Sequence, residues 1–133
     1  MLKMLEAAAK IAMPTNDDFD VRSFLLGAIG IRKDGAMVCS KNGAVMDSTS
    51  MDNWHSIAGS HAEARLVRKL GKGGVVFISR VARKDGCLAM AKPCSTCSNI
   101  LKFAKVKKVI YSVNPLQYGV WIPKIDKDFI YYF

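Results

Sequence analysis

The segment Pro93-Cys94-Ser95-Thr96-Cys97 constrains the fold of this chain more than any other stretch of its sequence. Proline suits the first turn of a helix, and we expect this helix to continue to Ala104. Two cysteines three positions apart on a helix lie on one face, and the positive end of the helix dipole favours their thiolates. One helix start therefore presents two soft metal ligands together.

A second segment, His61-Ala62-Glu63, opens another expected helix over residues 60–71, where Ser60 and Glu63 have the spacing of a capping box. An imidazole added to two thiolates gives zinc three protein ligands and leaves the fourth tetrahedral position open, as in catalytic zinc sites. We therefore predict that His61, Cys94 and Cys97 bind one Zn²⁺ ion.

Glu63 follows the predicted ligand His61 by two positions and supplies the acid–base group that such a site needs. A zinc ion held by two thiolates and a neutral imidazole is formally neutral and can still activate a bound water. A carboxylate beside that water can take its proton, pass it to a ring nitrogen and then protonate a departing amine. These are the steps of hydrolytic deamination.

The motif order, His-x-Glu followed by Pro-Cys-x-x-Cys, resembles the cytidine deaminase superfamily over roughly residues 23–113. The resemblance implies a three-layer α/β/α fold with a mixed sheet of about five strands, and a homo-oligomer. It gives His61, Cys94 and Cys97 the role of zinc ligands and Glu63 that of proton shuttle. It also implies that Asn42 contacts a sugar and that the backbone N–H of Ala62 receives the pyrimidine carbonyl.

Two further candidate substrate-binding residues, Trp54 and His55, lie in a long loop expected over residues 41–59. An aromatic ring there can stack on a base, and an imidazole can contact phosphate or sugar. Packing beneath the loop is the other interpretation of Trp54.

The remaining sequence predicts one α/β domain over residues 1–133, because the chain is long enough for one core and too short for two ordinary domains. An amphipathic helix is expected over residues 1–13, and turns over 32–35 and 83–86 close two hairpins. Strands are expected over residues 23–31, 36–40, 75–82, 87–91 and 108–113. Residues 114–133 are expected to be irregular and then extended.

Composition limits the location and the partners of the protein. No window approaches the roughly 20 apolar residues of a membrane span, and no secretory signal is evident, so we expect a cytoplasmic protein with no membrane partner. The net charge is +9, with a local concentration of lysines between Lys102 and Lys108. Such a charge suits an anionic partner, which could be a nucleotide or a nucleic acid, although an ordinary solvated surface would have the same composition.

The sequence has two further cysteines, Cys39 and Cys87, so roles of the cysteines other than catalytic zinc binding stay open. The four cysteines could form disulfides or a closed structural zinc site, or Cys94 and Cys97 could be a redox dithiol. Cys39 and Cys87 fall in expected strands without a second Cys-x-x-Cys pair, so we expect both to be buried strand residues.

These observations predict a zinc-dependent hydrolase that deaminates a cytosine nucleotide or nucleoside to the uracil form. One alternative is a deaminase that acts on cytosine or adenine within RNA or single-stranded DNA, as the charge would allow. The other is a non-catalytic zinc-containing binding module with the same fold. Ammonia release by the zinc form would separate the enzymes from the module.

Overall fold

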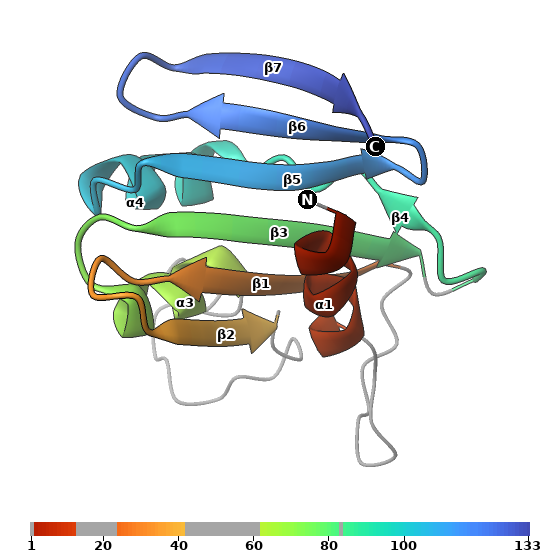
Figure 1. Cartoon of the computed structure of the whole chain (residues 1–133), viewed down its shortest axis with the longest axis horizontal. Coiled ribbons are helices and arrows are strands. Elements are labelled where there is room, and N and C mark those ends of the chain that lie inside the picture. The colour runs from red at the N-terminus through yellow and green to blue at the C-terminus, as the bar shows by residue number, and fades with distance from the viewer. Residues whose placement is uncertain (1, 13–23, 42–61, 83) are drawn as a thin grey trace.

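The computed structural model describes residues 2–12, 24–41, 62–82 and 84–133, and these form a seven-stranded sheet with helices on both faces (Figure 1). The helices are α1 (Leu2–Ala12), α3 (Ala62–Leu70) and α4 (Ser95–Phe103). The strands are β1 (Phe24–Ile31), β2 (Met37–Lys41), β3 (Val75–Ala82), β4 (Leu88–Ala89), β5 (Lys108–Asn114), β6 (Gln117–Ile122) and β7 (Lys127–Tyr132). The predicted three-layer α/β/α fold with a mixed sheet is confirmed, with more strands than the five expected.

The strand order is β2-β1-β3-β5-β6-β7, and β4 pairs with β3. The neighbours β3 and β5 are parallel, with Val75 opposite Lys108, whereas the other neighbours are antiparallel. A parallel pair needs a crossover connection, and here the crossover contains β4 and α4. The Pro-Cys-x-x-Cys segment is therefore tied at both ends to adjacent strands of the sheet.

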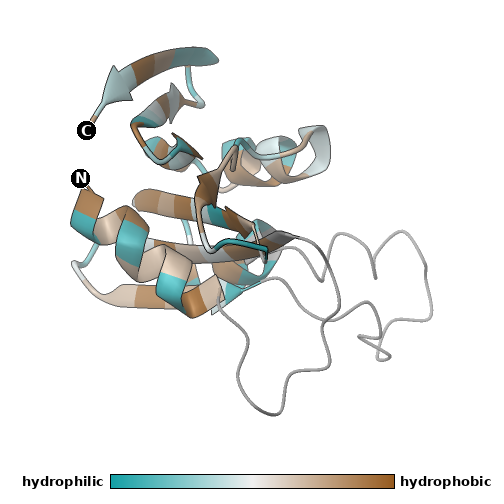
Figure 2. Cartoon of the chain, turned by 90° about the vertical axis from the view of Figure 1, so that its right-hand side faces the viewer, coloured by the Kyte–Doolittle hydropathy of each residue, from teal (hydrophilic) through white to brown (hydrophobic). Residues whose placement is uncertain are grey.

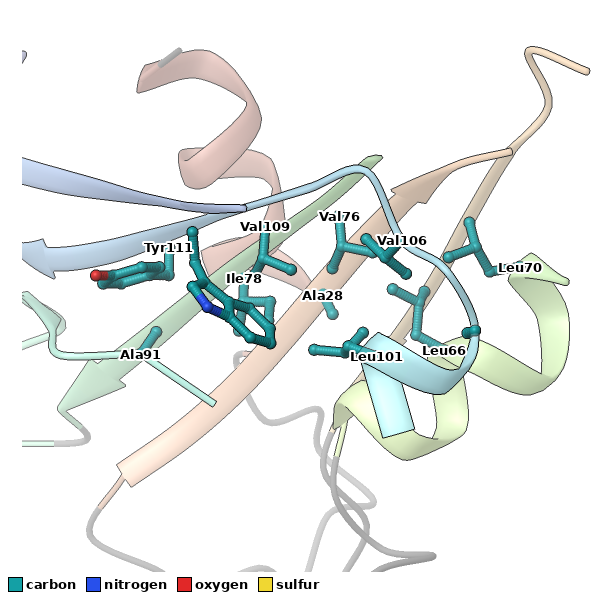
Figure 3. Close-up of a cluster of buried hydrophobic side chains, with 12 residues drawn as sticks. Ala28, Leu66, Leu70, Val76, Ile78, Ala91, Leu101, Val106, Val109 and Tyr111 are labelled. Carbon is teal, nitrogen blue, oxygen red and sulfur yellow. The ribbon is translucent and has the colours of Figure 1, made fainter. Parts of the chain in front are cut away.

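Successive side chains of β3 point to opposite faces of the sheet, and each face is covered by different helices. Val76 packs with Leu66 of α3 and Leu101 of α4 in the larger core (Figure 3). Its neighbour Phe77 points to the opposite face and packs with Leu5 of α1. Figure 2 shows α1 and α4 on opposite sides of the sheet. Alternation with period two thus assigns each helix to one face.

Helix α1 lies unusually close to β1. A Cβ added to Gly27 would collide with the backbone oxygen of Ala8 and stand 2.8 Å from the nitrogen of Ala12. The Ser79 hydroxyl donates a 2.6 Å hydrogen bond to the carbonyl of Leu5. Glycine in β1 and serine in β3 therefore fix this helix on the sheet.

No helix of the described residues is long and apolar enough to cross a membrane.

The prediction that residues 114–133 begin as an irregular segment was wrong. This part of the chain is the β6–β7 hairpin, in which Trp121 is 2% exposed. Pro115 and Pro123 flank β6 and do not interrupt it. Gly119 leaves room for a neighbouring ring, because a Cβ there would collide with the side chain of Tyr111. The prolines suggested irregularity, whereas they only mark the turns.

The prediction that Cys39 and Cys87 are buried was also wrong, because both are exposed. Cys39 lies on β2, an edge strand of the sheet, and alternates with the buried Ser40. Cys87 lies in the turn before β4, where its N–H donates to Asp85 Oδ1 at 2.9 Å. The strand expected over residues 87–91 is only the two residues of β4.

Candidate metal and catalytic site

Cys94 and Cys97 lie one turn apart at the N-terminus of α4. Cys94 is the N-cap residue, with extended backbone angles (φ −66°, ψ 170°), and its side chain makes no capping hydrogen bond. Its carbonyl accepts the N–H of Ser98 at 2.8 Å. Cys94 is exposed, whereas Cys97 is fully buried. One thiol at this helix end is therefore accessible to solvent, and the other lies in the core.

Glu63 brings the start of α3 to the same place. It is the second residue of α3 and only 3% exposed, and a carboxylate in the first turn interacts favourably with the helix dipole. Burial raises the pKa of the Cys97 thiol, and the negative charges of Glu63 and Cys94, with hydrogen bonds to both, raise this pKa further. Such effects need close approach, so Cys97 marks the meeting point of the two helix starts.

Three polar contacts hold the segment before α4. The Ala91 N–H donates to the carbonyl of Ser112 on β5 at 2.8 Å. Lys92 Nζ donates to Asp128 Oδ2 on β7 at 2.7 Å. The Ser98 hydroxyl donates to the carbonyl of Pro93 at 3.2 Å. The position of Cys94 is therefore set by two strands of the sheet as well as by its own helix.

Asp128 is a residue of this region that the sequence analysis missed. Its second oxygen, Oδ1, accepts the hydroxyl of Tyr111 at 2.8 Å. Burial raises the pKa of the Tyr111 phenol, and the hydrogen bond to Asp128 and its charge raise this pKa further, so the phenol stays a donor. Only the pairing of Trp121 with Asp128 places this carboxylate near Lys92, and that register is not a local feature of the sequence.

Of the predicted site residues, the structure brings together Glu63, Cys94 and Cys97. Ala62 is the first residue of α3. The predicted ligand His61 and the predicted substrate-binding residues Asn42, Trp54 and His55 lie outside the described residues. Within the described ranges no group of three or more His, Cys, Asp or Glu side chains could hold a metal ion.

The donor chemistry at the start of α4 nevertheless fits part of a zinc site. Thiolates are soft ligands that zinc prefers, and two of them one helical turn apart supply half of a tetrahedral set. The buried carboxylate of Glu63 adds an acid–base group at the same point. The arrangement can therefore support a metal-activated proton transfer once a further ligand is provided.

No family model and no curated protein matches the sequence. Among solved structures, the chain is similar to cytidine deaminase from Mycobacterium tuberculosis, with a TM-score of 0.50 and 18% sequence identity over 86% of this chain and 89% of that chain. A mutant of that enzyme gives a TM-score of 0.49 and 18% identity over 86% and 91% of the two chains. The chain therefore has a cytidine deaminase-like fold.

Proposed function

We propose that this protein is a zinc-dependent hydrolase that converts the cytosine base of a nucleoside or nucleotide to uracil and releases ammonia. The observation that carries the proposal is the convergence of a buried carboxylate, Glu63, with Cys94 and Cys97 where α3 and α4 begin. The cytidine deaminase-like fold supports a nucleoside-type substrate.

The zinc ion would be held by His61, Cys94 and Cys97. Of these, His61 directly precedes α3 in the sequence. One imidazole and two thiolates give zinc three protein ligands, which is the number typical of a catalytic site. A fourth protein ligand would close the position that a catalytic site keeps open. When bound, zinc supplies a Lewis acid that makes a water molecule nucleophilic near neutral pH.

Glu63 would move the protons. Its carboxylate accepts one proton of the attacking water and delivers it to N3 of the pyrimidine, and it then passes the second to the departing amino group. A C4–O bond forms and the C4–N bond breaks, so cytosine and water become uracil and ammonia. Burial of Glu63 keeps competing water away from the carboxylate while it exchanges these protons.

Substrate binding would use the start of α3 and the segment before it. The first N–H groups of a helix have no partner within the helix, so the Ala62 N–H can donate to the pyrimidine carbonyl. Asn42 would contact the sugar. Trp54 would stack on the base, and His55 would contact sugar or phosphate.

Ammonia release by the purified zinc-loaded protein tests the proposal, with cytidine and deoxycytidylate as substrates. Glu63→Ala should lower the rate by about 10²–10⁴-fold, because it removes the general acid–base group, while the zinc content stays unchanged. Full activity of zinc-loaded Glu63→Ala would contradict the proposed role, and a zinc-loaded protein inert on all nucleobase substrates would favour a binding module.

Self-association and a cytoplasmic location stay predictions. The edge strand β7 exposes Phe129 and Tyr131 at 42% and 46%, and Tyr131 stacks on Tyr118 with ring centroids 5.5 Å apart. An exposed edge strand with aromatic side chains is a surface that a second copy of the chain can cover. Light scattering during size exclusion, at several protein concentrations, checks the oligomeric state.

A further inference from the structure

One end of the sheet gathers lysines from four separate loops. The β1–β2 turn, the starts of the parallel strands β3 and β5, and the β6–β7 turn all lie at this end, because β1 and β6 run antiparallel to β3 and β5, respectively. Figure 1 shows these loops together at the left edge of the sheet. Helices α3 and α4 end on this side, whereas Glu63 and Cys97 lie near their starts.

Two neighbouring hollows at this end share part of their lining. The first, of about 630 Å³, has Val106, Ile122 and Pro123 in its lining together with four lysines. The second, of about 570 Å³, is lined by the loop before β3 and the β1–β2 turn. Lys105 and Lys107 line both. We call this surface the basic channel and define it by Lys33, Lys72, Lys102, Lys105, Lys107 and Lys124.

The loops that carry these lysines are fixed to each other. The Gly73 N–H donates to the carbonyl of Ala104, and the Lys107 N–H donates to the carbonyl of Gly74, both at 2.8 Å. Gly74 has a φ of 87°, and a Cβ there would collide with the carbonyl of Ile31. The α3–β3 loop is thus held between the α4–β5 loop and the end of β1, so the channel is formed before any ligand binds.

Few negative charges compensate the basic channel. Asp34 pairs with Arg32 at 3.3 Å, and Asp126 pairs with Lys102 at 3.5 Å while accepting the Trp121 indole N–H at 2.9 Å. Among the described carboxylates, none forms an ion pair with Lys72, Lys105, Lys107 or Lys124. Like charges gathered in a groove without counter-charges attract a polyanion.

The length of the basic channel indicates a chain of phosphates. It crosses the sheet from the β1–β2 turn to the β6–β7 turn, which is four strand spacings of about 4.8 Å, or roughly 19 Å. Phe103, the last residue of α4, follows Lys102 in the sequence and is 85% exposed. It lines neither hollow, but its ring is accessible for a base to stack on. A flat membrane surface fits less well than a single strand, because four of these lysines line a hollow at whose base Val106 and Pro123 are buried.

We infer that the basic channel binds single-stranded nucleic acid through its phosphates, at a surface separate from the candidate deaminase site. Glu63 lies about 10 Å along α3 from the helix end that borders the channel, and it takes no part in the channel lining. The inference does not rest on the proposed function, since it uses none of the predicted zinc ligands.

Fluorescence anisotropy with a labelled single strand of about ten nucleotides tests the inference, at salt concentrations between about 50 and 200 mM. The logarithm of the affinity should fall linearly with the logarithm of the salt concentration. Lys105→Glu/Lys107→Glu should weaken binding at least about tenfold and reduce the slope by about 1.4, because each phosphate contact to a single strand contributes about 0.7. Lys33→Glu/Lys72→Glu, in the second hollow, should also weaken binding and provides an independent variant if the first is misfolded.

The matched control is Lys3→Glu/Lys84→Glu, which makes the same change in charge at two exposed lysines outside the basic channel. It should change affinity by no more than about twofold, as expected for charges distant from the contact. Equal losses in control and channel variants would overturn the inference, as would tighter binding to duplex DNA or to anionic vesicles, or no binding at all. Glu63→Ala should bind the strand like the wild type, so a failure of deamination is distinguishable from a failure of the channel.

Discussion

Lys92 Nζ donates a 2.7 Å hydrogen bond to Asp128 Oδ2, although the two residues are 36 positions apart in the sequence. This contact connects β7 with the segment that leads directly into Cys94. The hairpin of β6 and β7 is therefore part of the framework of the candidate site, even though it carries none of the predicted ligands.

A double-mutant cycle of Lys92→Ala and Asp128→Ala should give a coupling free energy of about 0.2–1 kcal/mol in urea unfolding, because Lys92 is about half exposed and water screens the pair. Each single variant should also lose zinc to a chelator faster than the wild type, since the contact positions Cys94. A coupling near zero together with unchanged zinc release would show that the contact does not support this segment.

Cys94→Ser should lower the zinc content and abolish ammonia release, because a hydroxyl is a poor replacement for a thiolate ligand of zinc. Cys39→Ser is the matched control, since Cys39 is also an exposed cysteine but lies on β2. Metal analysis after dialysis, combined with the ammonia assay, measures both effects. Equal zinc content in the two variants would exclude Cys94 as a ligand.

Gly27→Ala should destabilise the protein by about 1–3 kcal/mol, because the added Cβ collides with the backbone of Ala8 and α1 must move away from the sheet. Gly86→Ala serves as control: its added Cβ meets no atom within 4 Å, and only its φ of 71° opposes the substitution, at about 1 kcal/mol. Thermal and urea unfolding compare the two. A smaller loss for Gly27→Ala than for Gly86→Ala would argue against the close packing of α1.

Asp126 should make stability depend on pH in the acid range. The hydrogen bond from Trp121 lowers the pKa of Asp126, and the charge of Lys102 lowers this pKa further. A carboxyl whose pKa is lower in the folded state stabilises the protein fully above its unfolded value of about 3.9, and this contribution is lost as pH falls through the folded value. The stability difference between wild type and Asp126→Asn should therefore shrink below about pH 4. A difference that grows toward acid pH would have the wrong sign.

Sequence alone predicted the parts of the fold that depend on local signals. The strand Val75–Ala82 was predicted with its observed bounds, and the helix after Pro93 was predicted to within one or two residues, because apolar runs, proline and glycine mark such boundaries locally. The clustering of Cys94 with Cys97 follows from the same helical spacing. The role of His61 as a zinc ligand stays a prediction. The same is true of substrate binding by Asn42, Trp54 and His55.

The features that were missed depend on pairing between distant segments. Asp128 reaches Lys92 only because β7 pairs with β6 in the register that sets Trp121 opposite Asp128, and nothing within either strand specifies that partner. The exposure of Cys39 likewise follows from the position of β2 at the edge of the sheet. Local patterns identify a strand, but its place in the sheet decides which of its side chains are buried.

The parallel pairing of β3 with β5 also determines where this chain can tolerate a change in length. The connection between these strands must span a fixed distance and deliver Cys94 and Cys97 to one point, so an insertion within it would displace the thiols even if every strand still formed. The β1–β2 turn and the turn between Ile122 and Lys127 lie outside this connection, and neither carries a thiol. A tag inserted at either hairpin tip should therefore leave the sheet and the two thiols in place, although it would interrupt the basic channel, whereas a tag in the crossover should displace the thiols.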